Sequence, residues 1–173
     1  MTPAIIIATK AKIAFRLMQY EHDTTAPAYG LEAVEKLSLD PARVFKTLIF
    51  EMPQERFAVA ALPVTHELDL KACARIIGVK KAWMADPAEA MRISGYPIGG
   101  ISPLGHKRQL PLLIDASAQS FNTVFVSAGR RGLEIELAAD DLARLTAARF
   151  TDLKKPHHGV SSPPEIQPIR RDI

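Results

Sequence analysis

Cysteine is almost absent from this chain, because Cys73 is the single one among 173 residues. One cysteine cannot form a disulfide within the chain, and nothing in the composition indicates an oxidising compartment. Cys73 has the chemistry of a nucleophile, but a small core residue is the commoner role for a cysteine in an apolar segment such as residues 71–77. The sequence therefore does not indicate catalysis by a protein thiol.

Long hydrophobic runs and metal-binding patterns are also missing. No apolar stretch approaches the roughly 20 residues that span a bilayer. The first twelve residues have neither the long apolar centre nor the cleavage site of a signal peptide. The five histidines and the one cysteine form neither an HxxxH nor a CxxC pattern. We therefore expect a cytoplasmic protein without a membrane segment, a metal or a cofactor.

The motifs of nucleotide and serine hydrolases are incomplete. Segment 100–107 has the glycines of a phosphate-binding loop, but His106 occupies the lysine position and Pro103 lacks a backbone donor. No serine lies in a G-x-S-x-G elbow. Nucleotide hydrolysis is therefore not expected.

The composition that remains is typical of one folded domain. Hydrophobic residues make up 47% of the chain and charged residues 24%, which is the profile of a globular protein. The formal net charge of +3 permits a polyanionic partner without requiring one.

Helix and strand signals follow one another irregularly along the chain. Apolar periodicity, proline and capping residues predict helices over residues 3–12, 29–39, 69–78, 86–95 and 140–145. Period-two patterns predict strands over 15–20, 44–51, 56–62, 110–115, 123–127, 133–137 and 149–153. This order favours a mixed or barrel-like sheet over a regular βαβ repeat. We predict one α/β (α+β) domain over residues 1–153 and a Pro-rich polar tail over 154–173.

Lys46 is the first residue of chemical interest, because it lies in an otherwise apolar strand. Strict alternation places it on one face with Val44 and Leu48. Such a lysine either extends outward from an edge strand or provides a cation inside a pocket, and the pattern by itself leaves both open.

Two loops are the other candidates. The glycines of segment 99–105 allow close approach of the backbone to a ligand, with N–H groups turned toward an anion, or they form a tight barrel corner. Segment 127–132 places two arginines between glycines, which suits phosphate contact or a solvated β-turn.

Several short motifs occur together and carry a family resemblance. They are YEHD at 20–23, AVEKL at 33–37, VFKTL at 44–48, KA at 71–72, IGVKK at 77–81, GY at 95–96, GGISPLG at 99–105 and RGL at 131–133. With these motifs the chain resembles the YbaK-type Cys-tRNA(Pro) deacylases, relatives of the editing domain inserted in bacterial prolyl-tRNA synthetases. The resemblance runs from Thr2 to about Leu153.

The resemblance implies a mixed, mostly antiparallel β-barrel-like sheet surrounded by helices, with a cleft for the aminoacylated 3′ adenosine. It implies catalytic roles for Lys46, Gly100, Ile101 and Ser102. The resemblance, together with the arginine-containing segment 127–132 (the basic turn), suggests the following substrate-binding positions: Tyr20, Thr47, Gly99, Pro103, Ser127, Gly129 and Arg130. Ala128 departs from the family's glycine, which puts the local geometry in doubt if that position needs a positive φ.

The implied activity is a free-standing trans-editing deacylase that removes mischarged cysteine from tRNA(Pro), and possible substrates extend to Cys-tRNA(Cys). The implied route uses the substrate's own thiol, with N–H groups of 100–102 on the oxyanion. The implied partners are tRNA and, transiently, prolyl-tRNA synthetase. The alternatives are a deacylase for another small amino acid such as alanine, a non-catalytic tRNA- or nucleotide-binding module, and a hydrolase of small thioesters or adenylates.

Overall fold

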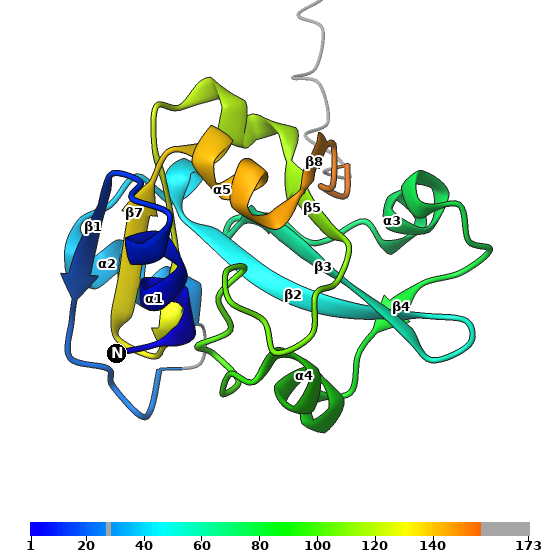
Figure 1. Cartoon of the computed structure of the whole chain (residues 1–173), viewed down its shortest axis with the longest axis horizontal. Helices are drawn as coiled ribbons and strands as arrows, with labels where there is room; N and C mark the ends of the chain where they lie inside the picture. The colour runs from blue at the N-terminus through cyan, green and yellow to red at the C-terminus, as the bar shows by residue number, and fades with distance from the viewer. Residues whose placement is uncertain (27–28, 157–173) are drawn as a thin grey trace, which may run out of the picture.

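The computed structural model describes residues 1–26 and 29–156 (Figure 1). The helical segments are α1 (Pro3–Lys10), α2 (Tyr29–Leu37), η1 (Pro41–Arg43), α3 (Leu70–Ile77), α4 (Pro87–Ser94), η2 (Ala116–Ser120) and α5 (Ala139–Thr146). The strands are β1 (Phe15–Gln19), β2 (Phe45–Met52), β3 (Arg56–Pro63), β4 (Trp83–Met84), β5 (Leu112–Asp115), β6 (Val124–Arg130), β7 (Leu133–Leu137) and β8 (Arg149–Thr151). Within these residues no helix is long and apolar enough to cross a bilayer.

Capping side chains explain where most helices begin. Thr2 accepts a hydrogen bond from the N–H of Ile5, Asp69 from that of Ala72, and Asp86 from that of Ala88, each satisfying a donor that the first helical turn leaves free. The helix predicted over residues 140–145 takes Asp140 as its N-terminal cap, and this capping role is wrong. Helix α5 begins at Ala139 and has no side-chain cap, so that Asp140 lies in its first turn, where its charge favours the helix dipole.

The strands form two sheets that meet without closing a barrel. One sheet has the antiparallel order β1-β7-β6, and the other has the order β4-β2-β3-β5-β8, in which β3–β5 and β5–β8 are parallel. The sheets join where Val44 forms a parallel bridge with Phe125. The expected mixed, mostly antiparallel, barrel-like sheet with surrounding helices is confirmed.

Strand β2 crosses the molecule from the three-stranded sheet to β4 (Figure 1). It pairs with β3 along its whole length, from Phe45↔Pro63 to Met52↔Arg56. Its two faces contact different clusters, because Phe45 and Ile49 belong to the main core while Phe50 and Met52 pack with Leu113. The strand thus runs between two apolar layers.

The predicted boundary between the domain and the tail stays a prediction. Leu153 is buried, and the backbone N–H of Lys155 still donates to the carbonyl of Glu67 at 2.9 Å. Residues 157–173 of the predicted tail lie outside the described part of the chain.

Candidate active site

A cavity of about 380 Å³ lies beside the first half of β2. Its walls come from β2, the N-terminal turn of α2, the segment 98–101, the region 84–90 and the facing strands β6 and β7. Among its lining residues are Lys46, Thr47, Gly99, Ile101, Ser127 and Glu134. The volume suits a small ligand.

Lys46 lines this cavity and is only partly exposed. Burial lowers the pKa of its ammonium, and the charge of Glu67 partly opposes this shift. The ammonium has no hydrogen bond or ion pair within residues 1–26 and 29–156. The geometry therefore favours the second of the two sequence interpretations, a cation at a pocket.

Glu134 is a pocket residue that the sequence interpretation missed. It is 7% exposed, and burial raises the pKa of its carboxyl group from 4.5 to about 8. Its carboxyl has no hydrogen-bond partner in the described part of the chain. The sequence signal that could have found Glu134 is the one that indicated Lys46, an ionisable residue in an apolar strand. The alternation Leu133–Glu134–Ile135–Glu136 is, however, equally typical of a strand whose glutamates face solvent.

Two predicted binding residues, Ser127 and Tyr20, lie beside Glu134, and a third, Thr47, lines the same cavity. Ser127 lies directly opposite Glu134 in the β6–β7 pairing, so both side chains share one face of the sheet. Tyr20 joins the same region through its N–H, which donates to Gly132 at 2.9 Å. Burial and the charges of Glu134 and Glu32 raise the pKa of the Tyr20 hydroxyl to about 12. Thr47 lines the cavity, and its hydroxyl is buried without a partner in the described chain.

The loop 95–105 is held by its own hydrogen bonds. The hydroxyl of Tyr96 donates to the carbonyl of Leu104 at 2.6 Å, and the N–H of Leu104 donates to Ser102 Oγ at 3.2 Å. Ser102 is fully buried and Pro103 is buried, whereas Gly99 and Ile101 line the cavity. The side chain of Ser102 therefore acts within the loop, and any contact with a ligand falls to its main chain.

The predicted oxyanion donors differ in availability. The N–H of Gly100 donates to the carbonyl of Pro97 at 3.0 Å, closing a turn. The N–H groups of Ile101 and Ser102 have no acceptor among the described residues. Of these two residues, Ile101 lines the cavity, whereas Ser102 is fully buried in the loop.

The basic turn packs against this loop. A side chain at Gly100 would meet the Cα atom of Arg130 at 2.7 Å, so only glycine allows this contact. The doubt about Ala128 is resolved, because the positive φ angles fall at Gly129 and Gly132 while Ala128 is a buried strand residue. Gly129 is buried and Arg130 is exposed, so the arginine side chain is available for an anion.

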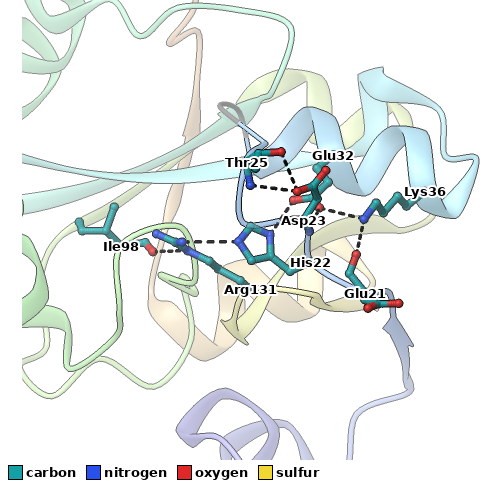
Figure 2. A network of polar contacts seen from close by, with 8 residues as sticks. All are labelled: Glu21, His22, Asp23, Thr25, Glu32, Lys36, Ile98 and Arg131. Carbon is teal, nitrogen blue, oxygen red and sulfur yellow. Dashed lines mark hydrogen bonds and ion pairs between the residues drawn. The ribbon is translucent and has the colours of Figure 1, made fainter.

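A polar network joins two walls of the cavity (Figure 2). Arg131 Nε donates to the carbonyl of Ile98 at 3.0 Å, and its guanidinium lies 3.5 Å from Nε2 of His22. His22 Nδ1 is 2.8 Å from a carboxylate oxygen of Glu32 in α2. Ile98 and the residues before Glu32 both line the cavity, so this network links the loop to the helix.

Neither the single cysteine nor His106 belongs to this pocket. Cys73 is fully buried in α3 within the second core cluster, and burial raises the pKa of its thiol to about 11. His106 Nε2 donates to the carbonyl of Ser102 at 2.5 Å and faces a different cavity. In the described ranges, no three potential metal ligands lie together.

Comparisons with known proteins place this site in a family context. The chain is 34% identical over 153 residues to the Enterococcus faecalis protein named "Putative Cys-tRNA(Pro)/Cys-tRNA(Cys) deacylase EbsC", covering 88% of this chain and 92% of that one. It is 25% identical over 128 residues to the proline–tRNA ligase of Pelobacter propionicus, covering 73% of this chain and 22% of the ligase.

A solved structure confirms the fold. The crystal structure of "a putative trans-editing enzyme for prolyl tRNA synthetase" superposes with a TM-score of 0.76 at 20% identity, covering 90% of this chain and 99% of that chain. The sequence pattern of the family described as the aminoacyl-tRNA editing domain matches residues 25–145. The chain therefore belongs to the aminoacyl-tRNA editing domain family, within which the sequence motifs already resembled the YbaK-type deacylases.

Proposed function

We propose that this protein is a free-standing deacylase that removes mischarged cysteine from tRNA(Pro). The observation that carries the proposal is one small pocket lined by Lys46, Glu134 and the loop around Gly99 and Ile101, in which neither the ammonium nor the carboxyl group has a hydrogen bond or ion pair among the described residues. Its relative in E. faecalis bears the name of a Cys-tRNA(Pro)/Cys-tRNA(Cys) deacylase, which supports the same substrate class.

The bond to be broken is an ester between the aminoacyl carbonyl and a ribose hydroxyl of the terminal adenosine. Its cleavage passes through a tetrahedral oxyanion, which preorganised donors stabilise. We assign this role to the N–H groups of Ile101 and Ser102, which have no acceptor among residues 1–26 and 29–156. Lys46 holds the phosphate of the terminal nucleotide or stabilises the developing charge.

The nucleophile is assigned to the substrate. Cys73 is buried outside the pocket with a raised thiol pKa, and the lining hydroxyl of Ser127 accepts a hydrogen bond from the N–H of Gly129. The cysteinyl thiol attacks its own carbonyl, so that a C–S bond forms, the C–O bond breaks and the thiol proton passes to the ribose oxygen. Well-oriented intramolecular attack contributes about 7–11 kcal/mol.

The partners follow from this substrate. The tRNA binds mainly through its phosphates, with Gly129 and Arg130 at the turn beside the pocket, and binding weakens as salt rises. A small domain has little surface for reading an anticodon, so tRNA identity comes from a transient complex with prolyl-tRNA synthetase. The site of action is the cytoplasm, where both partners occur.

Deacylation of purified Cys-tRNA(Pro) by the wild type and by Lys46→Ala tests the proposal. We expect rapid loss of cysteine and a reduction of about 100-fold in the variant, whereas Lys10→Ala, which removes an exposed lysine from α1, keeps the wild-type rate. Retention of cysteine on the tRNA in the presence of wild-type protein contradicts the proposal.

Ser-tRNA(Pro) and Ala-tRNA(Pro) measured in parallel test the route. Thiol assistance predicts that neither is released rapidly. Equal rates for all three esters would exclude it, and a preference for alanine would keep the site while changing its substrate.

A further inference from the structure

Strand β2 has a gap in the pairing of one of its edges. The edge facing β3 is paired throughout. The opposite edge is occupied at its start, where Val44 bridges Phe125, and at its end, where Phe50 and Glu51 pair with β4. Between these ends, residues 46–48 have no strand partner on this side within the described chain.

The direction of the free main-chain groups follows from the register. In an antiparallel pair, the peptide groups of alternate residues point to opposite edges. The N–H of Val64 donates to the carbonyl of Val44 at 2.9 Å. The peptide N–H and C=O groups of Val44, and by alternation those of Lys46 and Leu48, therefore point to β3. The N–H of Ala85 donates to the carbonyl of Ile49 at 3.1 Å, so the odd-numbered residues point the other way. The N–H and C=O of Thr47 therefore point to the unpaired edge.

This edge opens into the candidate active site. The cavity is lined by the consecutive residues 44–49. A cavity over one face of a strand would contact alternate residues, so a continuous run means that it reaches the strand edge. The hydroxyl of Thr47 is also buried without a partner in the described chain. Polar groups at such a place need a hydrogen-bonding partner, and a ligand can supply it.

We propose that the peptide group of Thr47 binds the aminoacyl group of the substrate as one added residue of antiparallel strand. An aminoacyl ester carries the same N–Cα–C=O unit as a residue in a chain. The N–H of Thr47 donates to the ester carbonyl, and the C=O of Thr47 accepts from the α-ammonium group. The gap spans few residues and the cavity is only about 380 Å³, so its occupant is one amino acid and not a peptide strand.

This assignment rests on the proposed deacylase function and adds a role to it. Main-chain contacts hold the reacting carbonyl whatever the amino-acid side chain is. The N–H of Thr47 also strengthens its hydrogen bond as the carbonyl oxygen gains charge, beside the donors of the loop.

An amide-to-ester replacement at position 47 tests the donor. In a Thr47→Val protein, valine is compared with its α-hydroxy acid, which removes the N–H and weakens the preceding carbonyl of Lys46 as an acceptor. We expect kcat/KM for Cys-tRNA(Pro) to fall about tenfold, with a smaller drop in melting temperature than the loss of a paired N–H causes. An unchanged kcat/KM overturns the proposal while leaving the deacylase function intact.

The matched control is the α-hydroxy acid of phenylalanine at position 50. Phe50 lies outside the cavity lining, and the same alternation directs its N–H to β3. This ester should lower the melting temperature and leave kcat/KM of the folded protein unchanged. A drop in melting temperature of the same size at position 47 would show that the Thr47 N–H is paired within the protein, against the proposal.

Two measurements on the wild type do not depend on turnover. Amide hydrogen exchange should be faster at Thr47 than at Phe50, and equal protection overturns the open edge. The stable amide 3′-deoxy-3′-(L-alanylamino)adenosine should shift the Thr47 amide resonance and bind about tenfold more tightly than its propanoyl analogue, which lacks the amino group. Equal affinities overturn the acceptor role of the Thr47 carbonyl, and a wild type without deacylase activity would refute the proposed function separately.

Discussion

Glu32 and Glu134 are both buried, at 6% and 7% exposure, but their surroundings differ. Glu32 accepts from the N–H of Asp23 at 2.7 Å, and His22 Nδ1 and the Lys36 ammonium lie 2.8 and 3.2 Å away. Burial alone would raise the pKa of Glu32, but these partners together lower it below its usual value. Glu134 has no such partners in the described chain, and its pKa rises to about 8.

The comparison separates a structural carboxylate from an available one. The hydrogen-bonding capacity of Glu32 is used within the protein, where it joins α2 to the preceding segment (Figure 2). The carboxyl of Glu134 faces the cavity and can hydrogen-bond to a ligand instead. A buried acid without partners at a pocket is the pattern expected of a functional group.

The largest expected effect is on the pH dependence of stability. Because the folded pKa of Glu134 is raised from 4.5 to about 8, the folded state holds a proton that the unfolded state releases. The stabilisation is complete below about pH 4.5 and is lost as the pH rises through 8. Between pH 5 and 8 the wild type should lose on the order of 3 kcal/mol of unfolding free energy relative to Glu134→Gln. Urea denaturation of both proteins across this range measures the difference, and parallel curves would contradict it.

Removal of the paired carboxylate should have a smaller effect, of about 2 kcal/mol. Glu32→Ala leaves the N–H of Asp23 without its acceptor and removes the carboxylate beside His22 and the Lys36 ammonium. The Lys36 ammonium keeps its bond to the Glu21 carbonyl, and the net effect destabilises the protein at neutral pH. Denaturation by urea measures the loss. Glu35→Ala, an exposed position of the same helix, is the control and should change stability by less than about 0.5 kcal/mol. An equal loss of unfolding free energy at positions 32 and 35 would show that the hydrogen bonds of Glu32 do not stabilise the fold, and would remove the distinction between Glu32 and Glu134.

The smallest effect on stability is expected from Arg131, which connects the polar network of His22 and Glu32 to the loop 95–105. Arg131→Ala removes the hydrogen bond to the carbonyl of Ile98, so the loop that carries Gly99 and Ile101 should become less ordered. Because Arg131 is exposed, unfolding free energy should change by less than about 1 kcal/mol. We expect KM for the aminoacyl-tRNA to rise about threefold with kcat unchanged, as for a loss of uniform binding. Arg144→Ala, an exposed arginine in α5, serves as the control, and a fall in kcat alone would argue against a positioning role.

Local signals in the sequence predicted most of the elements. Proline and aspartate marked the starts of α1, α3 and α4, and strand β7 has the predicted bounds. The two-residue strand β4 was missed, because a pattern needs more residues than that to appear. The predicted strand 123–127 continues to Arg130 through a register shift, which no alternation of apolar residues could reveal.

The sequence by itself determined most of the elements, the caps of α1, α3 and α4 and the family, and it indicated Lys46 and the loop 99–105 as candidate site residues, because these signals depend on residues close together in the chain. Only the tertiary structure decided which polar groups remain unpaired. Glu32 and Glu134 are the same residue type, and what distinguishes them is the set of neighbours that folding brings to each. The open edge at Thr47 likewise exists because, within the described residues, β4 pairs with one end of β2 and β6 bridges Val44 just before the other end, with no strand paired between them. Pairing across long sequence separations is a property of the folded chain, and it places the unpaired groups around one pocket.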